Sequence, residues 1–560
     1  MQGGRKSPLA RAYREFAIAE RRRSSDAEPV DFEAFLAGFR QPGVSRRDVL
    51  RASGILGAGM ALAACTPSSS SSSETASSPA SPSGSAATTP RVVVVGAGLA
   101  GVTAAYRLSR AGIPVQLFEA RDRLGGRCWT SRGWADGQTA EHGGEFIDTR
   151  HVHIRRLARE LGLSLDDLWA DYVPGASYPR WVQGSELTVG ETKPVMARIN
   201  AAAEKEARHV GLLDASGDVD MRAISYGTAT PAAVEVDQLS MAEWLDANVP
   251  GVTDSRVGAW LDQVMAGWYG LNMDGLSALN WMDYSVVPAP GADERWHVRG
   301  GNDQIVTRAA AALPQDSIHL DTALSALVRR GDGSYELTFD GGAPFVADLV
   351  VLTLPMSTLR QVDLTRAGFG EHTLDAIAHL VMGYDVKLLL QYDVRPTEMG
   401  NWSGGMDHTD PDFDTWESSA AQSGKAGLIT VYAGGTTGAS WTAPEPHATA
   451  PQPLVDDILG RIDDAVPGSR THFNGRAWAD LWTRDPWTNG AYAAFAPGQY
   501  TRFWGGTAQP DGGVHFAGEA TSTYSQGYLN GGVESGDRVA VEIMQMAGVP
   551  VPPALANLPH

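Results

Sequence analysis

Three glycines near residue 100, Gly96, Gly98 and Gly101, constrain the fold of this 560-residue chain more than any other feature. They follow residues 91–95, an apolar and mostly β-branched run that predicts a buried strand. Residues 99–111 come next and have a helical pattern of apolar positions. A strand, a G-x-G-x-x-G turn and a helix in this order predict a Rossmann-like unit, an α/β fold that binds the pyrophosphate of a dinucleotide.

Each glycine has its own physical role in such a turn. Gly96 permits the tight turn, Gly98 lets the backbone approach a pyrophosphate, and Gly101 lets the helix and the strand pack closely. The helix N-terminus then faces the phosphates. A second predicted strand, residues 115–118, ends directly before Glu119, whose carboxylate is placed to hold ribose hydroxyls. An acid at this position also argues against a cofactor with a 2′-phosphate.

The residues after this unit indicate FAD rather than NAD. Residues 119–127, EARDRLGGR, resemble the second glycine motif of the glutathione-reductase-like FAD proteins. Residues 142–147, HGGEFI, resemble the loop that passes by the flavin in the flavin-containing amine oxidase family. Residues 514–540 resemble the C-terminal flavin motif of the monoamine oxidases in that family, with a helix that begins near Asn530 and points at the flavin.

Two shorter segments, residues 299–313 and 349–355, also resemble this family, so the resemblance covers most of residues 91–547. It implies an FAD-binding domain interleaved with a substrate-binding α+β domain. It also implies noncovalent FAD, because monoamine oxidases attach FAD through a cysteine where this chain has Ala491. The cofactor-binding residues that it implies are Gly96, Gly98, Gly101, Glu119, Arg121, Gly126, Arg127, Gly143, Gly144, Glu145, Leu324, Gly518, Glu519, Tyr528 and Leu529.

Three residues match active-site positions of the family: Lys387 in VKLLLQY, Tyr492 in NGAYAAF and Tyr528 in QGYLNG. In the family, a lysine here holds a water against the flavin, and two aromatic residues face each other across the substrate amine. A lysine in an apolar strand is costly to bury without a function. Aromatic faces suit the partial positive charge of an amine nitrogen. The resemblance therefore implies catalytic roles for these three residues.

The reaction that the resemblance implies is oxidation of an amine to an imine, which water hydrolyses to an aldehyde or ketone plus ammonia or an amine. Oxygen then takes the electrons and becomes hydrogen peroxide. L-amino acid oxidases hold the substrate carboxylate with an arginine where this chain has Phe146, which weakens that reading unless Arg150 or Arg155 substitutes. The sequence is also compatible with a polyamine oxidase, with an amine dehydrogenase that reduces a cytochrome or quinone, and with a non-enzymatic flavin electron carrier.

The N-terminal residues resemble an export signal. Arg46 and Arg47 precede a weakly apolar segment, residues 55–64, that is too short to span a bilayer. Together they resemble a twin-arginine signal, whose translocase moves folded proteins with their cofactors in place. LAAC, residues 62–65, resembles a lipoprotein box, which implies a lipid anchor at Cys65 and a location in the periplasm or on the outer face of the cytoplasmic membrane. Cleavage by ordinary signal peptidase is the alternative.

The predicted organisation places several segments in each of two domains. The signal and lipobox take residues 1–65, a Ser/Pro-rich linker takes 66–90, and a tail takes 548–560. The predicted FAD-binding domain consists of residues 91–150, 290–350 and 475–547, and the predicted substrate-binding domain of residues 151–289 and 351–474.

The composition excludes several classes of protein. A formal net charge of −20 at pH 7 argues against binding nucleic acid, which needs basic surface. The chain has two cysteines, Cys65 and Cys128, which cannot form a disulfide framework. Motifs such as CxxC and HExxH do not occur, so the sequence predicts no metal site. The substrate, the oligomeric state and the role of residues 1–44 are left open.

Overall fold

The computed structural model describes residues 90–558 except residues 171, 172 and 288. The predicted twin-arginine signal, the lipobox with Cys65 and nearly all of the predicted linker lie outside the described residues. Within the described part of the chain, no helix combines the length and the apolar character needed to cross a membrane.

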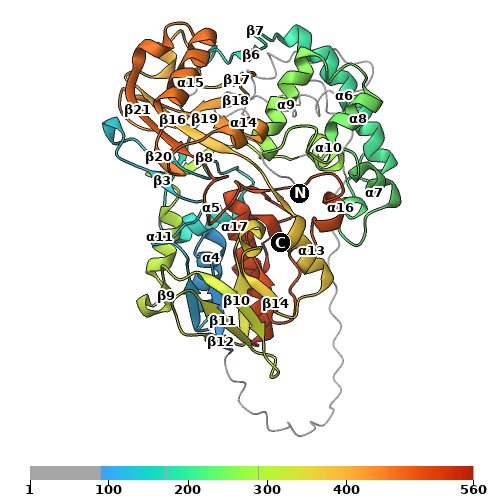
Figure 1. Ribbon diagram of the computed structural model, residues 1–560, viewed down its shortest axis with the longest axis vertical. Coiled ribbons are helices and arrows are strands. Elements are labelled where there is room, and N and C mark those ends of the chain that lie inside the picture. Colours follow the sequence, from blue (N-terminus) through green and yellow to red (C-terminus); the bar gives the residue numbers. More distant parts are fainter. Residues whose placement is uncertain (1–89, 171–172, 288, 559–560) are drawn as a thin grey trace, which may run out of the picture.

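A parallel five-stranded sheet forms the lower part of the molecule in Figure 1, in the order β23-β13-β1-β2-β9. Every residue of its central strands β1 and β13 is buried, as expected for a parallel sheet covered on both faces. This arrangement confirms the predicted Rossmann-like α/β fold. The strands are β1 (Val92–Val95), β2 (Val115–Phe118), β9 (Ile318–His319), β13 (Leu349–Leu352) and β23 (Val514–Phe516).

Two helices that are far apart in the sequence pack closely beside this sheet: α4 (Leu99–Arg110) and α17 (Leu529–Met546). Their contact depends on a small residue, because a Cβ at Gly536 would lie 2.5 Å from the carbonyl oxygen of Ala100. Helices α5 (Val152–Glu160) and α11 (Gln304–Ala311) complete this layer. The N-terminal and C-terminal parts of the described chain are thereby joined in one core.

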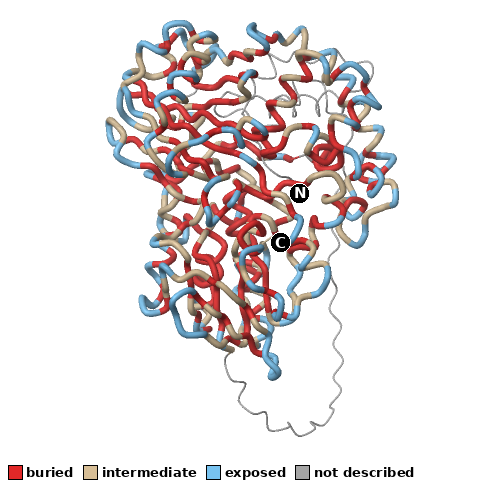
Figure 2. The backbone as a smooth tube through the Cα atoms, viewed as in Figure 1, coloured by how far each residue is buried: buried red, intermediate tan, exposed pale blue. Residues whose placement is uncertain are grey.

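An eight-stranded sheet forms the upper left of the molecule in Figure 1, in the order β20-β21-β16-β19-β18-β17-β6-β7. Residues of β16 and β19 are buried along their whole length, and Figure 2 shows buried backbone running through this sheet. Its strands are β6 (Arg180–Val182), β7 (Ser185–Glu186), β16 (Val386–Tyr392), β17 (Met406–His408), β18 (Phe413–Glu417), β19 (Gly427–Ala433), β20 (His447–Thr449) and β21 (Phe473–Asp480).

Helices form the upper right of the molecule, share a core with the parallel and four-stranded sheets, and contact the eight-stranded sheet through α9 (Arg256–Tyr269) (Figure 1). They begin with normal capping residues: the side chain of Thr188 caps α6, and that of Ser240 caps α8. The helices are α6 (Val189–His209), α7 (Pro231–Asp237), α8 (Met241–Asn248), α9 (Arg256–Tyr269) and α10 (Ala278–Val286), and α15 (Gln452–Ala465) covers the sheet itself.

Smaller elements connect these parts. A four-stranded sheet consists of β10 (Leu324–Arg329), β11 (Tyr335–Phe339), β12 (Phe345–Ala347) and β14 (Asp363–Arg366). Short pairs are β3 (Thr130–Ser131) with β4 (Ala140–Glu141), β5 (Leu165–Asp167) with β8 (Trp296–Val298), and β15 (Val381–Met382) with β22 (Ala493–Ala494). Short helices are α12 (Met356–Leu359), α13 (Glu371–His379), α14 (Gly435–Ser440), α16 (Tyr500–Phe503) and α18 (Pro553–Ala556), the last within the predicted tail.

Two of the predicted domain limits fall inside strands. Strand β13 crosses residue 350 and belongs to the parallel sheet, whereas β21 crosses residue 475 and belongs to the eight-stranded sheet. The hydrogen bonds between strands decide which sheet each strand joins, and a short strand-like run in the sequence does not reveal its partners.

Candidate active site

The glycine turn, the loop after β4 and the N-terminal end of α17 surround a cavity of about 510 Å³. Side chains of β16, β18 and β19 also line it, so the cavity joins the parallel sheet to the eight-stranded sheet. The structure brings nearly all the predicted site residues together here, and these line the cavity: Gly96, Gly98, Glu119, Arg121, Gly126, Arg127, Gly143, Gly144, Glu145, Leu324, Lys387, Tyr492, Gly518, Glu519, Tyr528 and Leu529.

Gly101 does not line the cavity but holds α4 against the turn. A Cβ at Gly101 would lie 1.9 Å from the carbonyl oxygen of Gly96, which no side chain tolerates. Gly96 has a φ of +99°, a conformation that favours glycine. Gly98 faces open space, because the nearest atom to a Cβ there would be the carbonyl oxygen of Gly125 at 3.8 Å. This cradle of backbone at a helix N-terminus fits the pyrophosphate of FAD.

Glu119 directly follows β2 and lines the cavity, where backbone groups hold its carboxylate. One carboxylate oxygen accepts a hydrogen bond from the backbone N–H of Ala97 at 2.7 Å, and the other accepts one from the N–H of Arg121 at 2.9 Å. These bonds fix the carboxylate at the end of β2, on the wall of the cavity. A fixed acceptor at this position fits the hydroxyls of an adenosine ribose.

Glu519 and Arg127 hold two distant loops at the middle of the cavity. The Arg127 guanidinium donates to Glu519 at 2.8 Å and to the carbonyl oxygen of Ala491 at 2.6 Å. The Glu519 carboxylate also accepts from the backbone N–H groups of Ala493 and Gly527, at 3.1 and 3.0 Å. These bonds fix the positions of the two segments that contain the predicted active-site residues Tyr492 and Tyr528.

Lys387 is buried on β16, with a relative exposure of 3%. Its ammonium group donates to the Glu145 carboxylate at 2.8 Å and to the carbonyl oxygen of Glu141 at 2.9 Å. It also lies 5.2 Å from the ring centroid of Trp416. The charge of Lys387 is therefore compensated by Glu145, one of the predicted cofactor-binding residues, and both side chains line the cavity.

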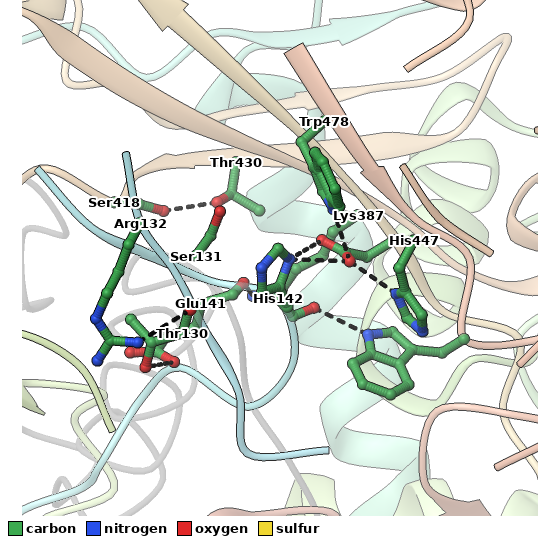
Figure 3. Close-up of polar contacts among 12 residues, drawn as sticks. Thr130, Ser131, Arg132, Glu141, His142, Lys387, Ser418, Thr430, His447 and Trp478 are labelled. Carbon is green, nitrogen blue, oxygen red and sulfur yellow. Dashed lines mark hydrogen bonds and ion pairs between the residues drawn. The ribbon is translucent and has the colours of Figure 1, made fainter. Parts of the chain in front are cut away.

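A buried chain of histidines and carboxylates supports the loop that bears Glu145 (Figure 3). Asp480 accepts hydrogen bonds from His142 at 3.0 Å and from His447 at 2.8 Å, and the other nitrogen of His447 lies 2.8 Å from Asp485. Burial alone would raise the pKa of Asp480, but the two histidines lower it below its usual range. This network fixes the backbone beside Lys387, which pairs with Asp480 across β16 and β21.

Tyr492 and Tyr528, which we call the cage tyrosines, both line the cavity and are each 8% exposed. The Tyr492 hydroxyl donates to the carbonyl oxygen of Gly267 at 3.3 Å. Burial, followed by the charge of Asp385, raises the pKa of Tyr492 well above its usual range. The Tyr528 hydroxyl donates to the Glu294 carboxylate at 3.3 Å. Each cage tyrosine therefore has a buried carboxylate beside it.

Sequence reasoning missed four residues that line this end of the cavity: Glu294, Asp385, Trp416 and Tyr432. The Trp416 ring lies 5.4 Å from Tyr432 and 5.3 Å from Phe146, so these three rings form one aromatic wall. Asp385 directly precedes β16 and lies two positions before Lys387, a spacing at which extended backbone directs side chains to the same face, and both residues line the cavity. That spacing was the one signal in the sequence that could have identified Asp385.

The charges at this end favour a cationic ligand. Among the described residues that line the cavity near the cage tyrosines, Lys387 pairs with Glu145 and Arg127 pairs with Glu519, and Glu294 and Asp385 are two further acids. Phe146 lines the cavity, but Arg150 and Arg155 do not. Arg150 lies 3.3 Å from Asp148, and Arg155 donates to the carbonyl oxygen of Thr149. Neither Arg150 nor Arg155 therefore reaches the cavity to replace the arginine that is absent at Phe146.

Comparison with known proteins assigns the family. The family described as flavin containing amine oxidoreductase matches residues 99–544 of this chain. The chain belongs to this family. It is therefore an oxidoreductase that acts on amines and uses FAD as its cofactor. Within the described residues, no group of three or more His, Cys, Asp or Glu side chains is arranged to hold a metal ion.

Relatives and solved structures agree with this assignment. A putative flavin-containing monoamine oxidase, AofH, of Mycobacterium tuberculosis is 28% identical over 490 residues, which cover 81% of this chain and 96% of that protein. Amine oxidase A of Sus scrofa is 26% identical over 82% of this chain and 85% of its own length. Cyclohexylamine oxidase from Brevibacterium oxydans has the same fold, with a TM-score of 0.68 and 22% identity over 82% of this chain and 99% of that one.

Proposed function

We propose that this enzyme oxidises the C–N bond of a small amine to an imine, which water hydrolyses to a carbonyl compound, and that oxygen accepts the electrons and becomes hydrogen peroxide. The observation that supports this function is the continuity of one cavity from the dinucleotide turn at Gly98 to Lys387 and the two cage tyrosines. FAD, when bound, supplies the two-electron acceptor.

The residues of the chain bind and orient the substrate. The faces of Tyr492 and Tyr528 position the amine nitrogen, since aromatic rings attract partial positive charge. The wall formed by Phe146, Trp416 and Tyr432 excludes water from the apolar part of the substrate. Lys387, held by Glu145, positions a water molecule for oxidation or for hydrolysis of the imine.

The excess of acids around the cage tyrosines favours amines over L-amino acids, because Asp385 and Glu294 would repel a substrate carboxylate. The same excess supports a second candidate function, the oxidation of diamines or polyamines. A solved structure of putrescine oxidase bound to putrescine has this fold, with a TM-score of 0.67 and 20% identity over 81% of this chain and 99% of that one.

Export of the loaded enzyme is part of the proposal. Arg46 and Arg47 before an apolar segment support the twin-arginine route, and LAAC supports lipidation of Cys65 on the outer face of the cytoplasmic membrane. At that location, a cytochrome or quinone could replace oxygen as the acceptor. Mass spectrometry of the membrane fraction tests the anchor: a diacylated peptide that begins at Cys65 is expected, and an unmodified peptide would contradict it.

The decisive experiment mixes the FAD-loaded full-length enzyme anaerobically with monoamines, diamines and L-amino acids, and follows loss of the oxidised flavin absorbance. Bleaching by amines and not by amino acids is expected. Bleaching by amino acids alone would identify an L-amino acid oxidase, and no bleaching by any compound would favour an electron carrier. Admitting air afterwards tests the acceptor, since hydrogen peroxide should appear in proportion to the amine consumed.

A further inference from the structure

Glu294 combines burial with an unusual backbone conformation at the active site. Its side chain lines the cavity and the residue is 2% exposed, and its carboxylate accepts the hydrogen bond of Tyr528 at 3.3 Å. Its φ is +42°, which is uncommon for a residue other than glycine and is maintained only where surrounding contacts enforce it. The strained backbone and the contact with Tyr528 together single out Glu294 as a candidate substrate-binding residue.

Asp148 enforces this conformation. One oxygen of its carboxylate accepts hydrogen bonds from the backbone N–H groups of Asp293 and Glu294, at 2.9 and 2.6 Å. The other oxygen lies 3.3 Å from Arg150 and 3.4 Å from His151. These contacts fix the backbone at Glu294, so its side chain is directed by the fold rather than by the substrate.

Several charged groups near Glu294 contact one another, while Glu294 itself lines the cavity beside Tyr528. Arg150 compensates Asp148 on one side. His151, whose ring lies 4.7 Å from that of Tyr528, is neutral because burial lowers its pKa to about 4. Asp293 accepts the backbone N–H of Thr149. Across the cavity, Lys387 and Glu145 compensate each other.

An amine substrate must lose a proton before it can be oxidised, and a carboxylate can accept that proton. An aliphatic amine has a pKa near 10, so roughly one molecule in a thousand is neutral at pH 7. Loss of a hydride from the α-carbon requires the lone pair of the nitrogen, which an ammonium lacks. A buried carboxylate beside the cage tyrosines binds the ammonium, and in a dry cavity the neutral pair of amine and carboxylic acid is favoured over the two charges.

We propose that Glu294 binds the substrate ammonium and accepts its proton before oxidation. One N–H bond breaks and one O–H bond forms, which leaves a neutral amine between the cage tyrosines and a neutral carboxyl group on Glu294. The proton returns to solvent when the product leaves. This inference rests on the proposed amine oxidation and adds the residue that prepares the amine for it.

The first test measures protons rather than turnover. tert-Butylamine has no hydrogen on its α-carbon and cannot be oxidised, so its binding to the FAD-loaded enzyme can be followed by calorimetry at pH 7 in buffers of different ionisation enthalpy. The wild type should release about zero protons, because the ammonium proton moves to Glu294. Glu294→Gln should bind more weakly and release close to one proton, because it must take the neutral amine. Equal proton release by both proteins would overturn the inference.

The second test compares two amines of the same length under anaerobic conditions, one ordinary and one fluorinated so that it is mostly neutral at pH 7. Glu294→Gln should reduce flavin on the order of 100-fold more slowly with the ordinary amine, the usual effect of losing a general base, and the loss should shrink as pH approaches 10. The fluorinated amine should show a much smaller loss. An equal loss with both amines would refute proton transfer.

Asp293→Asn is the matched control, because Asp293 is the neighbouring acid on the same loop but does not line the cavity. It should leave the ratio between the two amines as in the wild type. If Asp293→Asn reproduces the Glu294→Gln pattern, loosening of the loop explains it and the inference fails. If Glu294→Gln slows flavin reduction by diamines alone, Glu294 binds the second ammonium of a diamine and the inference fails. If no amine reduces the flavin of the wild-type enzyme, the proposed function itself is refuted.

Discussion

Replacing Lys387 by methionine should destabilise the folded enzyme as well as slow it. The side chains of Lys387 and Glu145 are 4% and 5% exposed, and their charged atoms lie 2.8 Å apart. Methionine has a similar length but removes the cation, so the Glu145 carboxylate stays buried without its partner. Breaking a buried ion pair in this way costs about 3–5 kcal/mol. The lost hydrogen bond to the Glu141 carbonyl adds about 1 kcal/mol.

This loss of stability is large enough to be measured as a change in melting temperature. A chain of this length has an unfolding entropy of about 1 kcal/mol per kelvin, so the expected drop in melting temperature is about 3–6 °C. The melting temperatures should be compared at one FAD concentration, because bound cofactor stabilises the folded state. Lys205→Met is the matched control, since Lys205 is exposed on α6 and its loss should change stability by less than about 0.5 kcal/mol.

A double variant separates the ion pair from the remaining effects of the substitution. Lys387→Met combined with Glu145→Gln removes both charges and should recover most of the lost stability. FAD binding should persist in Lys387→Met, with flavin reduction or reoxidation greatly slowed. If Lys387→Met melts within about 1 °C of the wild type, or if the double variant melts no higher than Lys387→Met, the buried pair does not have this energetic role.

Two further predictions concern stability and cofactor binding. Burial, followed by the charge of Asp262, raises the pKa of Asp412 to about 6. The folded state therefore favours the protonated acid, and the stability that protonation of Asp412 contributes is lost as pH rises from about 4 to 6. Asp412→Asn should therefore stabilise the enzyme by at most about 3 kcal/mol at pH 7.5 and by about a third as much at pH 4.5, and an equal shift in melting temperature at both pH values would contradict this. Gly98→Ala should fold but bind FAD more weakly, because its Cβ meets no protein atom closer than 3.8 Å and projects into the cofactor space. Gly101→Ala should lower the melting temperature even without FAD, since its Cβ would meet a backbone oxygen at 1.9 Å; the opposite ranking in melting and FAD titration would refute these assignments.

Local features of the sequence determined the dinucleotide-binding part of the fold. The apolar run before Gly96, the helix after Gly98 and the acid after the second strand are all short-range patterns, and β1, α4 and β2 lie where these patterns predict them. Such patterns depend on backbone geometry over a few residues and therefore survive in any tertiary context. Lys387 and the two cage tyrosines could be named from the family resemblance for a similar reason, since each lies in a short recognisable segment.

The tertiary structure alone decided what surrounds these residues. Tyr528 meets Glu294 across 234 positions of sequence, and Lys387 meets Glu145 across 242. No periodicity or spacing connects such partners, because each pair joins segments that are distant in the sequence and meet only in the folded protein. The sheet that β21 joins is likewise decided by its hydrogen bonds to β16, which pair residues far apart in the sequence and leave no local pattern in it. The sequence therefore determined the cofactor and the family, whereas packing decided the charges that face the substrate.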